Sequence, residues 1–210
     1  MRGSRKVGGA ARTSGRGSPV SRRLANYTAL AGEFYVLAEL ALRGLDGSLT
    51  LGHTKEIDIL ILNRKTKRTF QLEVKTTAKG VQRSEIFGLH YGWLMHERHG
   101  HVSNDNLLYA FVLLEEETGK QRRPRFFLVP SGDVAAYVRW EYRTWRRHST
   151  RQTGKLSSMR EFRIPIGDVS RGKLPPSWRD GRWKRYEGNW GIFGRSPVGS
   201  LAGRRRSSSP

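Results

Sequence analysis

The chain has 210 residues, which is enough for one domain with a sizeable core and a tail at each end. Its 39 Lys and Arg residues outnumber 18 Asp and Glu residues, and the formal charge of +21 favours a polyanionic partner such as nucleic acid. The absence of cysteine excludes disulfides, thiolate catalysis and cysteine-based zinc sites, and no apolar run approaches the ~20 residues that a membrane-spanning helix needs.

The two ends of the chain differ in composition from its middle. Residues 1–22 are rich in Gly, Ser and Arg and contain no acid, which predicts a disordered basic tail. Residues 194–210 are interpreted as a second basic tail, and residues 23–193 as the folded domain. Without the ten cations at the two ends the remainder is still about +11, so the predicted domain is basic too. The N-terminal composition also fits an organellar transit peptide, a minor alternative to a cytoplasmic location.

The apolar patterns along the chain predict a single α/β domain with a mixed central sheet flanked by helices. The first helix is expected to bury Leu30, Phe34, Leu37, Leu40 and Ala41 and to end at Gly44. The predicted elements are a helix at 24–43, a strand at 49–51, a hairpin of strands at 57–62 and 69–75, a helix at 85–99, strands at 107–114 and 126–129, a helix at 134–147 and a strand at 161–166.

The predicted hairpin brings two acidic side chains together. If its turn is centred on residues 65–66, the numbers of paired residues sum to 131. Asp58 then lies opposite Glu73, with facing Cβ atoms roughly 5 Å apart. Because two facing carboxylates repel, we expect a divalent cation to offset the repulsion. Lys75 projects from the same face as Glu73, since side chains alternate along a strand.

A third carboxylate, Glu33, is expected inside the apolar stripe of the first helix, where it is costly unless paired or metal-bound. Glu33, Asp58 and Glu73 are therefore expected to supply oxygen ligands to one Mg²⁺ ion, with Mn²⁺ as the alternative. Lys75 would position or deprotonate the attacking water, or neutralise charge that develops on a phosphate.

Accessory candidates and competing interpretations accompany this site. Gln71 shares the strand face of Glu73, and His53 lies in the loop before the Asp58 strand. The competing interpretation is ordinary ion pairing, since Glu56 faces Lys75 in the same register and a slip of one residue removes the facing carboxylates. A surface or groove role is preferred to a metal site for the histidines at 90, 96, 99 and 101.

Two basic segments are predicted to contact nucleic acid. The helix at 134–147 has a cationic face that suits a phosphate backbone. The segment 178–186 mixes aromatic and cationic residues, as proteins that bind single strands do. For both segments the alternative is that the tryptophans simply pack in the core. The candidate residues are Arg139, Arg143, Arg146, Arg147, Arg182, Lys184 and Arg185.

Together, the segments Gly32–Leu40, Asp58–Leu60 and Gln71–Thr76 resemble the PD-(D/E)XK nuclease superfamily, which has the restriction-endonuclease-like fold. Small bacterial PD-(D/E)XK endonuclease-like proteins and archaeal-type Holliday junction resolvases are similar, over about residues 27–193. The resemblance implies an αβββαβ core and a catalytic set of Glu33, Asp58, Glu73 and Lys75 with Mg²⁺. The proline of the superfamily name is absent, since Ile57 precedes Asp58.

The function expected from the sequence is a Mg²⁺-dependent DNA endonuclease that hydrolyses phosphodiester bonds. The alternative is a noncatalytic nucleic-acid-binding protein that retains the nuclease fold, and a third interpretation is a basic scaffold of a ribonucleoprotein. The expected partner is DNA, with no membrane, in the bacterial cytoplasm or nucleoid. Because related nucleases often form dimers, a homodimer is left open.

Overall fold

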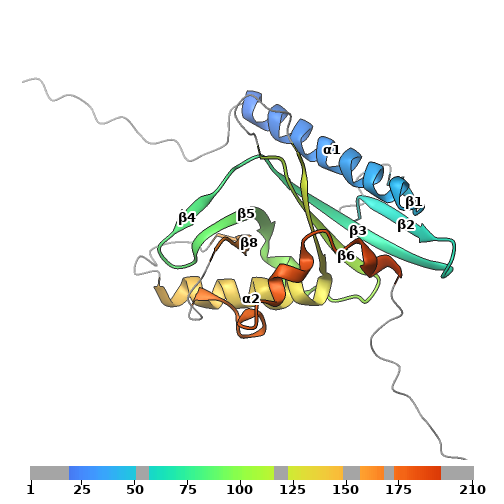
Figure 1. The fold of residues 1–210 in the computed structure, drawn as a ribbon. Coiled ribbons are helices and arrows are strands. Elements are labelled where there is room, and N and C mark those ends of the chain that lie inside the picture. The colour runs from blue at the N-terminus through green and yellow to red at the C-terminus, as the bar shows by residue number, and fades with distance from the viewer. Residues whose placement is uncertain (1–18, 51–56, 116–122, 149–156, 168–172, 195–210) are drawn as a thin grey trace, which may run out of the picture.

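The computed structural model describes residues 19–50, 57–115, 123–148, 157–167 and 173–194 (Figure 1). These residues form an α/β fold with two α-helices, a five-stranded mixed sheet and a three-stranded antiparallel sheet. The elements in chain order are α1 (Pro19–Leu42), β1 (Asp46–Leu49), β2 (Ile59–Asn63), β3 (Arg68–Thr77), β4 (Gln82–Ser84), β5 (Gly88–His96), η1 (Glu97–His101), β6 (Leu107–Leu113), β7 (Arg125–Pro130), α2 (Ser131–His148), β8 (Met159–Pro165), η3 (Pro176–Trp178), η4 (Arg182–Tyr186) and η5 (Trp190–Gly194), where η denotes a 3₁₀ helix.

The large sheet has the strand order β1-β2-β3-β6-β7, and the small sheet has the order β4-β5-β8. Every neighbouring pair is antiparallel except β3 and β6, which run parallel. Parallel neighbours need a long crossover connection. Residues 78–106 provide it here, and they carry β4, β5 and η1. The crossover therefore places the small sheet next to the large one.

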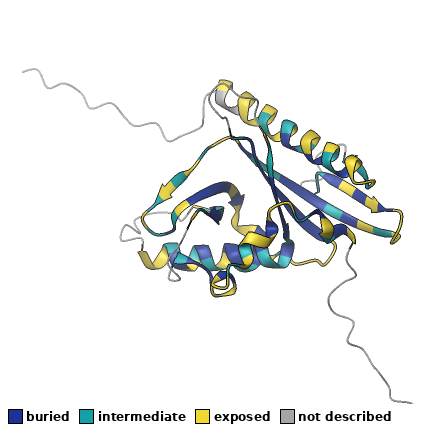
Figure 2. Ribbon diagram, viewed as in Figure 1, coloured by how far each residue is buried: buried dark blue, intermediate teal, exposed yellow. Residues whose placement is uncertain are grey.

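The two faces of the large sheet carry separate hydrophobic cores. Because strand side chains alternate, Tyr109 of β6 faces one core while Ala110 faces the other. Val36 and Leu40 of α1 pack on the Ala110 side, whereas the small sheet and α2 cover the Tyr109 side (Figure 1). Every residue of β6 is buried, which confirms the prediction of a strand covered on both faces (Figure 2).

The first helix differs from its prediction at the start and in its buried face. It begins at Pro19 instead of near residue 24, so residues 19–22 of the predicted tail are helical. The predicted stripe is wrong at Leu30, Phe34 and Ala41, which are exposed. The side that packs on the sheet includes Gly32 together with residues 36 and 40.

Gly32 explains how α1 is rotated about its axis. A Cβ atom added to Gly32 would lie 1.9 Å from Oγ1 of Thr76 in β3, so the helix approaches the strand where it has no side chain. This approach turns the neighbouring Glu33 toward the end of β3. The helix ends as predicted at Gly44, which has a φ of +67°, with the amide of Leu45 donating to the carbonyl of Leu40 at 3.0 Å.

The helix predicted at 85–99 is wrong, because residues 88–96 form strand β5. Tyr91, Trp93 and Met95 alternate into the core, and β5 pairs along its length with β8. The indole N–H of Trp93 also donates to the carbonyl of Val112 in β6, at 2.9 Å. Cross-strand pairing and aromatic packing outweigh the local helical pattern, so the crossover helix of the expected αβββαβ order is replaced by β4, β5 and η1.

The other predicted elements are close to those observed. The strands at 107–114, 126–129 and 161–166 and the helix at 134–147 are confirmed with small shifts as β6, β7, β8 and α2, and the strand at 49–51 becomes β1, at Asp46–Leu49. Trp178 and Trp190 are buried, which favours the packing interpretation for the C-terminal tryptophans. No helix in the described segments is long and apolar enough to cross a membrane.

Candidate active site

The β2–β3 hairpin has the predicted register. Ile59 pairs with Leu72 and Asn63 with Arg68, so the numbers of paired residues sum to 131. The side chain of Asn63 sets this turn, because its Oδ1 accepts hydrogen bonds from the amides of residues 65 and 66 at 3.0 and 3.2 Å. Its Nδ2 donates to the carbonyl of Phe193 at 3.0 Å, which ties the turn to η5.

The last pair of the hairpin ladder at this end is Ile59 with Leu72, so Asp58 and Glu73 do not form the predicted pair. The amide of Asp58 donates to the carbonyl of Leu72 at 2.9 Å, and Oδ2 of Asp58 accepts the amide of Val74 at 2.6 Å. A carboxylate gains more from a backbone N–H than from facing a second carboxylate. Asp58 therefore binds the β3 backbone beside Glu73 instead of facing Glu73 across a regular ladder.

Glu73 is only 3% exposed because it lies on the sheet face that the small sheet and η1 cover. Its Oε1 lies 2.5 Å from Nζ of Lys75, two residues along the same face of β3. Its Oε2 lies 3.6 Å from Nδ1 of His99 in η1. A hydrogen bond of 2.9 Å joins the same Nδ1 to the hydroxyl of Tyr109, which neighbours Glu73 in β6. One cation and one imidazole thus flank the buried carboxylate.

The pKa values of Glu33 and Asp58 show that the four predicted residues interact. Burial and then the charge of Asp58 raise the pKa of Glu33, while Lys75 lowers it. Burial raises the pKa of Asp58, the hydrogen bond from Val74 and the charge of Lys75 oppose this rise, and Glu73 adds to it. Like-charge repulsion in a partly desolvated place is the arrangement that a bound cation relieves.

The residues have the oxygen donors that Mg²⁺ prefers, and each has a repelling neighbour. Among the described residues, however, no three His, Asp or Glu side chains are gathered closely enough to hold a metal ion. The ammonium of Lys75 already pairs with one oxygen of Glu73. The donor types therefore fit the chemistry of Mg²⁺, and Asp58 is coupled to Glu33 and to Glu73, but the three carboxylates are not gathered around one point in this structure.

Of the two accessory candidates, Gln71 and His53, the structure describes only Gln71. Gln71 lies in β3 between Leu60 of β2 and Leu107 of β6, and its side chain makes no hydrogen bond with any described residue. His53 and Glu56 lie outside the described residues. His99, in contrast, contacts Glu73 although the sequence had placed it only in a surface cluster. No local signal identifies it, since the contact requires the β5–η1 segment to fold over β3.

All seven basic candidates are exposed, and some of them also contact neighbouring groups of the protein. The guanidinium of Arg139 donates to the carbonyl of Gly100 and so ties α2 to η1. The side chain of Arg146 lies 5.6 Å from the ring of Tyr142, and the side chain of Lys184 lies 5.5 Å from that of Trp183. Arg182 lies 3.7 Å from Asp180, and the remaining candidates on α2 and η4 are Arg143, Arg147 and Arg185.

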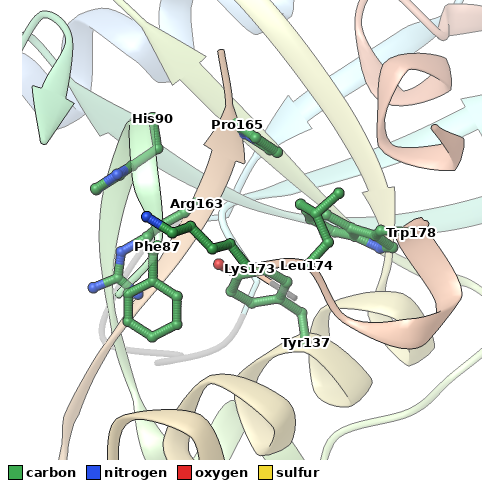
Figure 3. Close-up of a pocket in the computed structure, with 8 residues that line it drawn as sticks. All are labelled: Phe87, His90, Tyr137, Arg163, Pro165, Lys173, Leu174 and Trp178. Atoms are coloured by element: carbon green, nitrogen blue, oxygen red, sulfur yellow. The ribbon is translucent and has the colours of Figure 1, made fainter. Parts of the chain in front are cut away.

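A small cavity between β5, β8 and α2 is separate from these residues. Figure 3 shows His90, Tyr137 and Arg163 among the side chains that line it. Its volume is about 10 Å³, which is room for about one water molecule. Arg163 also donates to Glu141, outside the lining, at 2.9 Å, and burial is the main cause that raises the pKa of Glu141. None of the predicted catalytic residues lines this cavity.

No family model, curated protein or solved structure matched this chain in the three comparisons.

Proposed function

We propose that this protein is a Mg²⁺-dependent endonuclease that hydrolyses phosphodiester bonds of DNA, with a site of the PD-(D/E)XK type. The observation that carries the proposal is the ion pair between the buried Glu73 and the partly exposed Lys75, with Asp58 and Glu33 within electrostatic reach of Lys75. A buried carboxylate beside two further acids is an unfavourable arrangement for stability alone. Such clusters of perturbed acids are typical of functional sites.

The order of elements supports the proposal. Helix α1, strands β1 to β3 and then β6 parallel to β3 agree with the expected αβββαβ core, apart from the crossover helix. Glu33 comes from α1, Asp58 directly precedes β2, and Glu73 and Lys75 come from β3. The pKa values of Glu33 and Asp58 show that these residues lie within electrostatic reach of Lys75, which supports the proposal.

Glu33, Asp58 and Glu73 would hold Mg²⁺, or Mn²⁺ in its place, through carboxylate oxygens. When bound, the ion lowers the pKa of a water ligand and stabilises negative charge on a phosphate. The side chain of Lys75 is 28% exposed, so its ammonium can reach both Glu73 and a phosphate that approaches from solvent. His99 would support Glu73 from behind, since its Nδ1 lies 3.6 Å from Oε2 of Glu73 and is itself bonded to the hydroxyl of Tyr109.

A plasmid-nicking assay with Mg²⁺ tests the proposal. The wild-type protein should convert supercoiled DNA to nicked DNA, and Glu73→Gln and Lys75→Met should each lose at least about two orders of magnitude in rate, the scale on which single catalytic groups act. Glu85→Gln is the matched control, because Glu85 is an exposed carboxylate on another segment. Equal nicking by all four proteins would assign the cleavage to a contaminant and contradict the proposal.

A noncatalytic nucleic-acid-binding protein with this fold is the second candidate, and one observation favours it. Within the described residues no three potential ligands are gathered for a metal, and Lys75 occupies an oxygen of Glu73. Under this alternative, the wild type and both variants bind DNA with equal affinity and none of them cleaves it. A gel-shift measurement beside the nicking assay distinguishes the two functions.

A further inference from the structure

A cavity of about 540 Å³ opens at the end of the large sheet where β3 begins. Cavities of about 300–1,000 Å³ are typical of sites for small molecules and cofactors. Residues from β3, β6, β7, α2, η4 and η5 converge on it, as do residues 103–105 before β6. Neither the fold nor the proposed catalytic residues require a hollow of this size there.

Three arginines line the cavity, and two of them are accessible to a ligand. Arg185 is exposed and makes no ion pair or hydrogen bond with any described residue. The side chain of Arg182 is 47% exposed, and it lies 3.7 Å from Asp180. The guanidinium of Arg68 lies over the ring of Phe70, 4.6 Å from its centre, so the wall of the cavity presents a planar cation.

The two carboxylates that line the cavity offset this charge only in part. The hydroxyl of Tyr186 donates to Oδ2 of Asp133 at 3.0 Å. Asp133 also lies in the first turn of α2, where the helix dipole favours negative charge. Asp105 is exposed and is the remaining acid of the lining. The lining therefore favours an anionic ligand.

The floor of the cavity is apolar. Phe70 and Leu108 contribute from the sheet, and Ile192 contributes from η5. Contact with apolar side chains does not stabilise a phosphate ion, whereas the face of a nucleobase can stack on them. Asn189 adds an amide that can hydrogen-bond a base edge. Cations at the rim and an apolar floor together fit a nucleotide whose base is unpaired.

We propose that this cavity binds an unpaired nucleotide of a DNA strand, with the phosphate at Arg182 and Arg185 and the base over the apolar floor. The inference rests on DNA being the partner in the proposed function. Lys75 lies seven positions after Arg68 in β3, which is roughly 23 Å of strand at ~3.3 Å per residue. The nucleotide bound here is therefore not the one that is cleaved.

Fluorescence anisotropy of the full chain in EDTA tests this binding without cleavage. The probes are a labelled single-stranded 20-mer of DNA and a fully paired duplex of the same length. Arg182→Gln with Arg185→Gln should weaken binding of the single strand about tenfold. It should also make the slope of log K against log salt shallower by roughly 0.7, the contribution of the one phosphate that the two arginines contact. Affinity for the duplex should change no more than in the control.

The control is Arg83→Gln with Arg123→Gln, which removes two equally exposed cations that lie outside the cavity. It should lower the affinity for both probes by the same small factor. A second variant, Asn189→Trp, keeps every charge and fills part of the cavity. It should weaken binding of the single strand and leave the salt dependence unchanged.

Equal affinity and equal salt dependence of the wild type and both cavity variants on the single strand would overturn the proposal. So would an equal loss on single strand and duplex, because the cavity would then act only as surface charge. The outcome is independent of catalysis. If nicking fails but the single-strand preference depends on Arg182 and Arg185, the nuclease proposal falls and the nucleotide site stands.

Discussion

Gly32 of α1 and Thr76 of β3 are in such close contact that a Cβ atom on Gly32 would lie 1.9 Å from Oγ1 of Thr76. The hydroxyl of Thr76 is buried and has no hydrogen-bond partner among the described residues, so it serves as a packing surface. This contact determines where Glu33, the next residue, lies relative to β3. Helix packing and the geometry of the candidate site thus both depend on residue 32 being a glycine, which has no side chain.

Gly32→Ala is expected to destabilise the protein by about 1–3 kcal/mol, the usual range for overpacking a core. It should also reduce nicking beyond the loss of folded protein, because Glu33 moves away from Asp58. Urea denaturation and single-turnover nicking measure the two effects. Thr76→Ala should rescue Gly32→Ala in part, since it removes the nearest clashing atom. Full activity of Gly32→Ala would show that the position of Glu33 is unimportant.

The stability of Asp58→Asn distinguishes two interpretations of the acidic residues, a metal site and an ordinary cluster of ion pairs. Asparagine can still accept the amide of Val74. It removes the charge of Asp58, whose pKa is raised mainly by burial and less by Glu73, and which adds to the rise that burial causes in the pKa of Glu33. The variant should therefore be as stable as the wild type, or more stable, in EDTA. With free Mg²⁺ at ten times its Kd, the wild type should gain about 1.4 kcal/mol, or roughly 3–6 °C in Tm, and the variant much less.

Differential scanning calorimetry with EDTA and then with Mg²⁺ checks this result. Destabilisation of Asp58→Asn in EDTA, with no effect of Mg²⁺ on either protein, would mean that the acids serve the fold through ion pairs.

His99→Gln is expected to raise the Mg²⁺ concentration needed for half-maximal nicking, because a loss of support behind a ligating carboxylate typically costs about 10–100-fold in metal affinity or activity. Tyr109→Phe should produce a smaller change in the same direction, since it removes only the hydroxyl that bonds His99. The measurement is a Mg²⁺ titration of the initial nicking rate. A purely structural role would lower stability and leave the Mg²⁺ midpoint unchanged.

His90 should make the protein less stable in weak acid. Burial lowers the pKa of His90, a hydrogen bond to the carbonyl of Gly88 raises it, Arg163 lowers it and Glu161 raises it. Because the net shift is downward from 6.5, the unfolded chain binds a proton that the folded chain does not. The contribution to stability is therefore present above pH 6.5 and decreases as the pH falls toward the lowered pKa.

Urea denaturation at a series of pH values between 7.5 and 5 measures this dependence. His90→Gln should flatten the curve relative to the wild type over that range. The exposed His96 provides the control, and His96→Gln should keep the wild-type slope. Parallel curves for the wild type and His90→Gln would show that His90 titrates normally in the folded protein.

Much of this protein could be predicted from local patterns. The register of the β2–β3 hairpin follows from its turn residues and from the alternation of its side chains, since a slip of one residue would expose its buried face. The continuous apolar run of β6 and the glycine after α1 also act over a few neighbouring residues. The grouping of Asp58, Glu73 and Lys75 depends on this one hairpin, and the sequence was sufficient to propose it.

Other features required contacts between distant segments. Residues 88–96 have a mixed local preference, and pairing with β8 made them a strand. The approach of Gly32 to Thr76 set the rotation of α1, and so exposed Leu30 and Phe34 against the predicted stripe. The crossover from β3 to β6 carried His99 over Glu73.

By itself, the sequence determined the basic charge, the hairpin and its acidic and lysine side chains, because these depend on composition and on near neighbours. Only the tertiary structure decided the rotation of α1, the strand in the crossover, the neighbours of Glu73 and the cavity beside η4. The physical reason is that burial and strand pairing are gained only when distant segments meet, and their free energy outweighs local preference.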